Sequence, residues 1–564
     1  MDFRHPLARD VAYLALDPPA RVRMHRRLGE HLATTPLSQG ISAAIVARHL
    51  ARGESPGPAA ELYIEAATAA RAAHQAQLAQ RYYNRALGLL PAGDSRRMVA
   101  HEALEAIFRH LGRRRERRAH LSSLRKLARE SGQARWAALA LVRTARLDLD
   151  EGYLARGLPV AQRAAEVTRL AKKPALEVEA LTILGEILRE LGDVQGAIDA
   201  VERALKVAQA GGLPARARAE VLRAKGVLLR YGGRVTEAVE AYAEAIAVFK
   251  AVGARRAEAR VKNALAYAMF VLERFEDAIA VGMSSITIDL AIGGRFQIAK
   301  TLSNIGQAYA RIGDASRGIA YLRRARDAHE RYGDQDSRAD TLLCTAEILL
   351  EVGDVDGAHT LAGDAGALVA VTGSAYDLAH ERLTRALLSR TGGDARAAIA
   401  LAAESRRLSE AQGLVSYHAY ATAVEAVARV DAGEVHSGVL LARTALGSVE
   451  TTSSEYGLEI RALAAEALRK GAPGSAREAV GRAVGHARRV MSYIRDPRLA
   501  GLFLRRPVVS RIVAEADASG IPDAMETIRA GYIPPRDLVE PTSRRGAPPS
   551  YALSSAALRG KEPS

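Results

Sequence analysis

The sequence has very little cysteine and few aromatic side chains. Among its 564 residues, Cys344 is the only cysteine, and aromatic residues make up only 5%. A single cysteine excludes an intramolecular disulfide and a cysteine-based zinc site. Burial must therefore depend mainly on alanine, leucine, valine and isoleucine. This composition favours close packing of helix on helix over a β-sandwich, because strands prefer aromatic and β-branched residues.

Long apolar runs are also missing. No stretch reaches the roughly eighteen consecutive apolar residues of a membrane span. The first ten residues, MDFRHPLARD, lack the apolar core of a secretory signal peptide. We therefore expect no membrane association and predict a cytoplasmic protein.

The charge is strongly positive but evenly spread. The formal net charge is +16, and the sequence pI is about 10.0. Such a balance raises nucleic acid or an anionic membrane as possible partners. The arginines, however, are distributed along the whole chain beside 64 acidic residues. This distribution favours a solvated helical surface over a basic binding stripe.

The stretch from Leu181 to Ala210 predicts two helices that pack against each other across a Gly-Asp turn. Its apolar residues recur at helical spacing in both halves. Gly192 suits the left-handed position that ends a helix, and Asp193 can cap the next one. Since a lone helical hairpin cannot bury both of its apolar faces, the unit requires copies of itself.

The copies are present at a spacing of about 40 residues. One position in each first helix, usually occupied by a small residue, serves as the anchor of the register. The anchors are Ala67, Glu105, Ala145, Gly185, Gly226, Ala266, Gly306, Ala346, Ala386, Ala426 and Ala464. Further small residues follow about twelve and nineteen positions later, which indicates closely approaching helices. The pattern predicts about eleven helix hairpins.

These positions resemble the tetratricopeptide repeat. Tyr309, three residues after Gly306, matches the aromatic position of that family, and Pro91 matches its closing proline. The period exceeds the usual 34 residues, and the tryptophan of the motif is missing, since Trp136 lies elsewhere. The resemblance covers about residues 59–490. It implies an all-α fold, a right-handed superhelix of helix hairpins.

The two ends resemble a second group of proteins. Residues 3–16, FRHPLARDVAYLAL, are similar to the junction that leads into the helical arm of bacterial signal-transducing ATPases, and related arms occur in serine/threonine kinases and LuxR-type regulators. Residues 496–507 resemble the closing segment of such arms. We expect a winged-helix remnant with lead-in helices at 1–54, the repeat array at 55–490, capping helices at 491–533 and a disordered tail at 534–564.

Motifs for catalysis are missing. The sequence contains no phosphate-binding G-x-x-x-x-G-K-[ST] loop, no kinase motif set, no H-E-x-x-H pair and no G-x-S-x-G elbow. We therefore predict a chain that is not an enzyme and that holds no cofactor or metal. The densest basic cluster, Arg113 to Arg118, is interpreted as a solvated turn between helices, with a phosphate or acidic-partner contact as the alternative.

The family resemblance implies that the first helices of the hairpins line a concave groove for a peptide. Transferred by register, the lining would include Glu186 and Arg189 and, further along, a stronger candidate patch. Asparagine and arginine there could pair with peptide backbone and carboxylates. The predicted partner-binding residues are Arg223, Arg230, Asn263, Tyr267, Lys300, Ser303, Asn304, Gln307 and Arg311.

Three functions are consistent with the sequence. The leading hypothesis is a non-catalytic scaffold or sensor arm in bacterial signalling that binds a protein or peptide in this groove. The alternative is the sensor region of a larger ATP-binding regulator whose ATPase or kinase module is absent from this chain. The third is a basic solenoid associated with nucleic acid, which would require steep salt dependence.

Overall fold

The computed structural model describes residues 6–34 and 42–534, and in these residues every regular element is an α-helix. The 28 helices follow one another in a repeating arrangement, which confirms the predicted all-α class and the helical-repeat architecture. The predicted disordered tail lies, apart from residue 534, outside the described residues. The contacts within the chain divide it into two units, residues 1–213 and 214–564, and this division falls inside the predicted repeat array.

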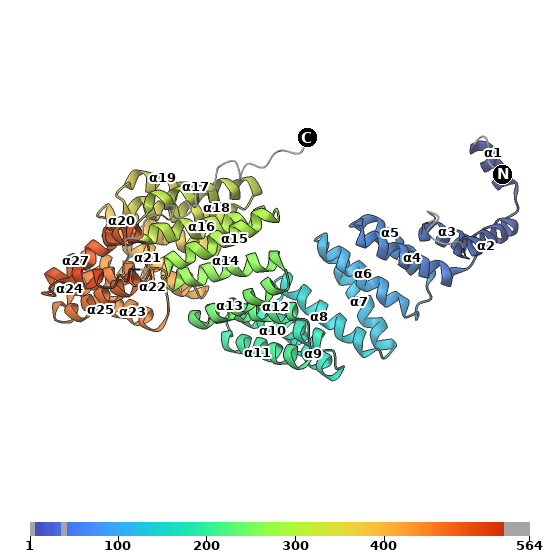
Figure 1. Cartoon of the computed structure of the whole chain (residues 1–564), viewed down its shortest axis with the longest axis horizontal. Helices are drawn as coiled ribbons and strands as arrows, with labels where there is room; N and C mark the ends of the chain where they lie inside the picture. Colours follow the sequence, from blue (N-terminus) through green and yellow to red (C-terminus); the bar gives the residue numbers. More distant parts are fainter. Residues whose placement is uncertain (1–5, 35–41, 535–564) are drawn as a thin grey trace, which may run out of the picture. The chain divides into compact units, whose positions relative to one another are not determined.

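Unit 1 (residues 1–213) begins with lead-in helices and continues as helix hairpins (Figure 1). Its helices are α1 (Pro6–Ala15), α2 (Pro18–Thr34), α3 (Ala43–Arg52), α4 (Pro56–Ala72), α5 (Ala76–Leu89), α6 (Arg96–His110), α7 (Arg114–Glu130), α8 (Ala134–Asp150), α9 (Leu154–Leu170), α10 (Pro174–Glu190) and α11 (Val194–Ala210). The first three lie close to the helices expected from the sequence. The origin of this end in a winged-helix segment stays a prediction.

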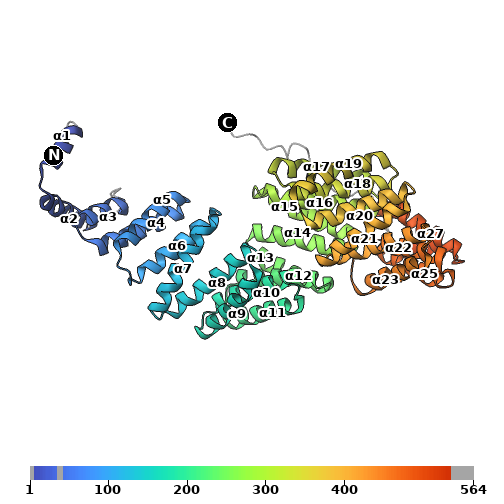
Figure 2. The same ribbon diagram turned by 180° about the vertical axis from the view of Figure 1, so that it is seen from behind.

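Unit 2 (residues 214–564) continues the hairpins and ends in three short helices (Figures 1 and 2). Its helices are α12 (Ala215–Tyr231), α13 (Val235–Ala251), α14 (Arg255–Val271), α15 (Phe275–Ala291), α16 (Arg295–Ile312), α17 (Ala315–Tyr332), α18 (Gln335–Glu351), α19 (Val355–Thr372), α20 (Ala375–Thr391), α21 (Ala395–Ala411), α22 (Val415–Asp431), α23 (Val435–Thr451), α24 (Gly457–Gly471), α25 (Pro473–Met491), α26 (Pro497–Leu504), α27 (Pro507–Ala518) and α28 (Ala524–Arg529).

The turn inside a hairpin has the predicted chemistry. Gly192 ends α10 with a φ of +86°, a left-handed conformation that costs glycine little. The carboxylate of Asp193 then accepts a hydrogen bond from the backbone N–H of Gly196 at 2.9 Å and so caps α11. Asp354 caps α19 in the same way, through the N–H of Gly357. The local sequence therefore specifies where each first helix stops and the second starts.

Small residues allow the two helices of a hairpin to approach closely. A Cβ placed on Gly306 of α16 would lie 2.9 Å from the carbonyl oxygen of Gly318 on α17. In unit 1 the equivalent second-helix positions, Ala197 and Ala204, are fully buried. The anchor Glu105 is the exception, because a carboxylate stands where its counterparts have alanine or glycine. It is buried, and Arg117 of α7 donates a hydrogen bond to it at 3.1 Å.

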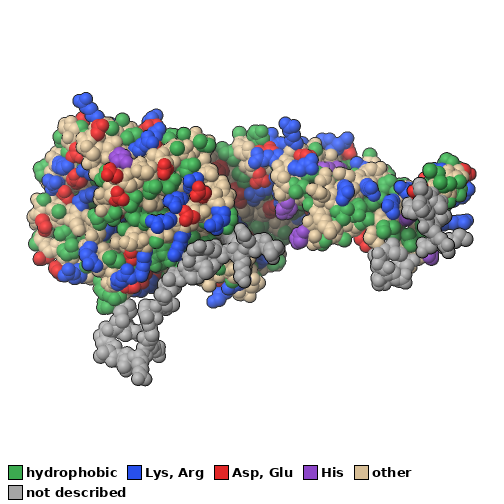
Figure 3. Space-filling model, turned by 90° about the horizontal axis from the view of Figure 1, so that it is seen from above, with side chains coloured by type: hydrophobic (Ala, Val, Ile, Leu, Met, Phe, Trp, Pro, Cys, Tyr) green, Lys and Arg blue, Asp and Glu red, His purple; other side chains and the backbone are tan. Residues whose placement is uncertain are grey.

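The interpretation of residues 113–118 as a solvated turn holds in part, because Arg113, Arg114 and Arg115 are exposed where α7 begins, whereas Arg117 is buried. Residues 114–118 form the first turn of α7, and Arg117 is only 4% exposed. Besides Glu105, Arg117 contacts Asp150 at 3.0 Å, while Arg118 pairs with Asp148 and Glu151. Arg117 and Arg118 therefore neutralise carboxylates outside α7. On the face shown in Figure 3, basic and acidic side chains are likewise interspersed.

In unit 2 the last helices, α24 to α28, pack against the earlier helices α14 to α17. One apolar core cluster contains residues from α14 to α17 and residues from α24 to α28, including Phe270, Phe275 and Phe503. Arg506, which precedes α27 and is 2% exposed, donates hydrogen bonds to Glu351 of α18 at 2.8 Å, to Glu459 of α24 and to the carbonyl of Arg311. The segment at 496–507, expected to close the array, thus joins repeats that are far apart in sequence.

Candidate functional site

A cavity of about 550 Å³ lies in unit 2. First helices of successive hairpins, α12, α14, α16, α18, α20 and α22, supply most of its lining, because they present equivalent faces at the 40-residue period. Seven of the nine predicted groove residues line it. They are Arg230, Asn263, Tyr267, Lys300, Ser303, Asn304 and Gln307.

An arginine between aromatic rings forms one part of the lining. The guanidinium carbon of Arg230 lies 4.4 Å from the ring centre of Tyr231 and 5.1 Å from that of Tyr267. Aromatic faces hold a guanidinium by cation–π attraction without consuming its ability to bind an anion. Arg230 is therefore positioned as a binding group for a carboxylate or a carbonyl oxygen.

Amide and hydroxyl groups of α14 and α16 form a second part of the cavity lining. The side-chain amide of Asn304 donates to the amide oxygen of Asn263 at 3.3 Å, so the two are held in neighbouring repeats. The hydroxyl of Ser303 lines the same cavity, is buried, and has no hydrogen-bond partner within the described structure. Because an unsatisfied buried hydroxyl is costly, this group is suited to a ligand.

Acidic and phenolic groups from later repeats complete the lining. Asp340 of α18 and Glu455, which precedes α24, contribute carboxyl groups, and burial raises the pKa of Glu455. The hydroxyls of Tyr376 and Tyr417 lie 3.2 Å apart. The cavity therefore combines groups of both charge signs with aromatic surfaces, which suits a ligand that carries amides and charges rather than an apolar one.

A buried histidine, His380, contacts the residues behind this part of the lining. His380 of α20 is fully buried, with Nδ1 3.2 Å from Asp340 and Nε2 3.0 Å from Glu347. Burial alone would lower the pKa of His380, but its hydrogen bonds to these two carboxylates raise the pKa to about 10. Tyr417 also lies 3.2 Å from Nδ1, which connects the histidine to the cavity lining.

Comparison with known proteins identifies part of the repeats. A tetratricopeptide-repeat family profile matches residues 176–251. No curated protein matches the sequence. Among solved structures, the apo form of RapI is similar over 62% of this chain and 97% of its own, with 11% identity and a TM-score of 0.51. A signal transduction ATPase with numerous domains (STAND) from Pyrococcus horikoshii, with a tetratricopeptide repeat sensor, is similar over 73% of this chain and 66% of its own, with 12% identity and a TM-score of 0.50.

The matched residues 176–251 belong to tetratricopeptide repeats, and the described chain has the fold of a helical solenoid of this type. This fold is a repeat scaffold consistent with a role in protein–protein interaction or sensing, and it is typically non-catalytic. In the described part of the solenoid, no helix has the length and apolar character needed to cross a membrane.

Two predicted groove residues of the solenoid lie away from the cavity. Arg223, on α12 like Arg230, pairs with Glu220 at 3.0 Å. Arg311 is 9% exposed, and its guanidinium is occupied by Glu459 and by Glu347, the latter at 3.2 Å. The register identified their helices correctly, but the ion pairs that occupy these two side chains depend on tertiary neighbours.

Several lining residues of the solenoid were missed by the sequence analysis. Asp340 and Arg260 stand six positions before their anchors, as Lys300 does, so the register could have found both. Tyr376 and Tyr417 lie near the starts of α20 and α22, outside the anchor-centred window. They reach the cavity because helices far apart in sequence surround it, and no local signal indicates that arrangement.

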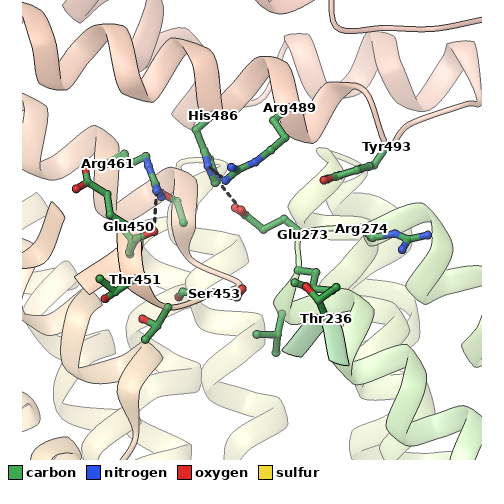
Figure 4. A pocket seen from close by; sticks show the side chains of 16 residues that line it. Thr236, Glu273, Arg274, Glu450, Thr451, Ser453, Arg461, His486, Arg489 and Tyr493 are labelled. Carbon is green, nitrogen blue, oxygen red and sulfur yellow. Dashed lines mark hydrogen bonds and ion pairs between the residues drawn. The ribbon is translucent and has the colours of Figure 1, made fainter. Parts of the chain in front are cut away.

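A second cavity of the solenoid, of about 500 Å³, lies where the late helices of unit 2 meet the early ones (Figure 4). In Figure 4, His486 of α25 points toward Glu273, and the two side chains are 2.5 Å apart. Arg489 contacts the other ring nitrogen of His486 at 2.5 Å. Arg461 is buried and donates to the carbonyl of Val449 at 2.8 Å. The contact between His486 and Glu273 therefore connects α25 to the turn that precedes α15.

Proposed function

We propose that this solenoid is a non-catalytic interaction arm that binds an extended protein or peptide segment in the cavity of unit 2. The observation that supports it is the gathering of Arg230, Asn263 and Asn304, with aromatic rings, around one cavity of about 550 Å³. Asparagine amides can pair with the peptide backbone, and Arg230 can bind a carboxylate. A cavity of this volume accommodates a few residues rather than a folded domain. A cytoplasmic location belongs to the same proposal.

The test compares two arginines of one helix. The full chain is immobilised, proteins bound from a bacterial lysate are identified, and the bound segment is then made as a synthetic peptide and titrated by calorimetry. We expect Arg230→Glu to weaken peptide binding about tenfold or more. Arg223→Glu, also on α12 but outside the cavity, is the matched control and should bind as the unchanged chain does. Equal affinity for both variants would refute the cavity as the peptide site.

A second candidate function is the sensor arm of a larger ATP-binding regulator. It is supported by the similarity of the ends to the arm junctions of signal-transducing ATPases and by the fold likeness to the STAND protein over 73% of this chain. In-frame translation of the DNA upstream of residue 1 tests it. A phosphate-binding loop in that sequence supports the sensor arm, whereas a stop codon preceded by a ribosome-binding site supports a free-standing arm.

A further inference from the structure

Three metal-ligating side chains meet behind the cavity lining. Asp340 and Cys344 stand one turn apart on α18, and His380 projects from α20. One donor atom from each lies within 4.8 Å of the other two. Cys344 is 5% exposed and His380 is fully buried, while Asp340 is partly exposed and lines the cavity. A single cysteine rules out a metal site built from several thiolates. It is compatible with a metal site whose ligands are one oxygen, one sulfur and one nitrogen atom.

The surroundings of His380 match those of a ligating histidine. Its Nδ1 lies 3.2 Å from the Asp340 carboxylate, close to the roughly 3.3 Å that separates two ligands of a tetrahedral zinc ion. Its Nε2 donates to Glu347 at 3.0 Å. Metal-bound histidines usually donate their second ring N–H to a carboxylate, which fixes the ring and the tautomer. Glu347 therefore acts here as a positioning residue.

The charge around the three donors is dominated by carboxylates. Asp377, on the first turn of α20, is 2% exposed and interacts electrostatically with Asp340 and His380. The buried guanidinium of Arg311 is already matched by Glu459 and Glu347. A divalent ion would compensate this excess of negative charge, and its binding would displace the proton of the Cys344 thiol, which burial otherwise favours.

We propose that Asp340, Cys344 and His380 form a binding site for Zn²⁺ beside the cavity, on whose side the hydroxyl of Tyr417 lies 3.2 Å from Nδ1 of His380. The mixed thiolate, imidazole and carboxylate set is typical of zinc and disfavours Mg²⁺ and Ca²⁺, which require oxygen ligands. The proposal does not depend on the identity of the ligand in the cavity.

The experiment uses the full chain without an affinity tag, after treatment with a chelator that removes bound metal. Co²⁺ serves as a spectroscopic probe for zinc. We expect one equivalent of Co²⁺ to bind, with the visible bands of tetrahedral cobalt and a near-ultraviolet thiolate-to-cobalt band, and Zn²⁺ to displace it. Cys344→Ser should abolish the thiolate band and weaken binding at least tenfold. Glu347→Gln should keep the thiolate band and weaken binding about tenfold.

The matched control is His329→Gln. His329 lines the same cavity and is buried, but it contacts Asp334 at 3.6 Å and contributes nothing to the three donors. It should bind Co²⁺ as the unchanged chain does. Circular dichroism establishes that each variant is folded. No thiolate band in the unchanged chain, or the same band in Cys344→Ser, would overturn the proposal and leave His380 as an imidazolium held between two carboxylates.

Discussion

The two units of the solenoid use one hairpin design, but among the described residues contacts between distant repeats are found in unit 2 and not in unit 1. The ion pairs described in unit 1 join residues up to 40 positions apart, as Arg146 and Glu186 do. In unit 2, Arg495 pairs with Asp277 across 218 positions. The described core clusters of unit 1 also combine only adjacent hairpins, whereas one cluster of unit 2 extends from Phe270 to Ile528. The stability of unit 1 therefore depends on contacts within and between neighbouring hairpins. The stability of unit 2 depends in addition on contacts between repeats that are far apart in sequence.

The largest effect is expected from the buried arginine of the closure. Arg506→Met leaves Glu351 and Glu459 without their shared cation, and breaking a buried ion pair costs about 3–5 kcal/mol. Urea denaturation followed by hydrogen exchange should show this loss in unit 2 and leave unit 1 unchanged. Arg505→Met is the control, because Arg505 is exposed and donates only to the carbonyl of Gly501. Equal opening of both units would contradict the comparison.

Low pH should destabilise unit 2, because it protonates a carboxylate that pairs with Arg506. Burial alone would raise the pKa of Glu459, but Arg506 and Arg311 lower it from 4.5 to about 2. A depressed carboxyl pKa contributes stability above its unfolded value, and the contribution is lost as the pH falls from about 4.5 through about 2. The expected loss is on the order of 3 kcal/mol. Hydrogen exchange across this range measures it, and the dependence should be flattened in Glu459→Gln. An unchanged profile in that variant would assign the effect to other groups.

The close approach of the two helices of a hairpin should contribute to stability independently of the contacts between distant repeats. Gly306→Leu places a side chain against the Gly318 carbonyl and against Leu322, so overpacking should destabilise unit 2 by about 1–3 kcal/mol. Gly363→Leu is the matched control, since a Cβ at this helical glycine of α19 meets no atom within 4 Å. Chemical denaturation compares the two. A Gly306→Leu chain as stable as Gly363→Leu would refute the register of small residues.

The smallest effects are expected at helix caps, where the two units should behave alike. Asp193→Ala in unit 1 and Asp354→Ala in unit 2 each remove one hydrogen bond to a backbone N–H, at a cost of about 1 kcal/mol. Denaturant titration with hydrogen exchange separates the two units. A clearly larger loss for Asp354→Ala would mean that closure also strengthens the hairpin turns of unit 2.

The hairpins could be predicted because their signals are local. Gly192 and Asp193 stop and start helices by their own backbone and hydrogen-bonding chemistry. The family register also selected the right helices for the cavity, which is why Arg230 and Asn263 lie on it. These features depend only on neighbours within one or two repeats.

The closure of unit 2 and the donor cluster could not be predicted in the same way. Arg311 and Arg506 look like ordinary surface arginines in the sequence, and their burial follows from contacts across 148 and 155 positions. Asp340 and Cys344 do show a one-turn spacing that suits shared ligation, and His380 follows one repeat later. A search for metal motifs within single segments overlooks such a set, because the solenoid brings its members together only by stacking.

Because the lining of the cavity extends to the start of the last helices of unit 2, the cavity is completed late in the synthesis of the chain. Glu455 lines the cavity just before α24, and Arg506 fastens that helix to α16 and α18. A ribosome delivers the hairpins carrying Arg230 and Asn304 well before these residues emerge, and repeat arrays fold as they are delivered. The hairpins that carry Arg230 and Asn304 are therefore made first, and the cavity gains Glu455 and the contacts of Arg506 only after the later helices are made.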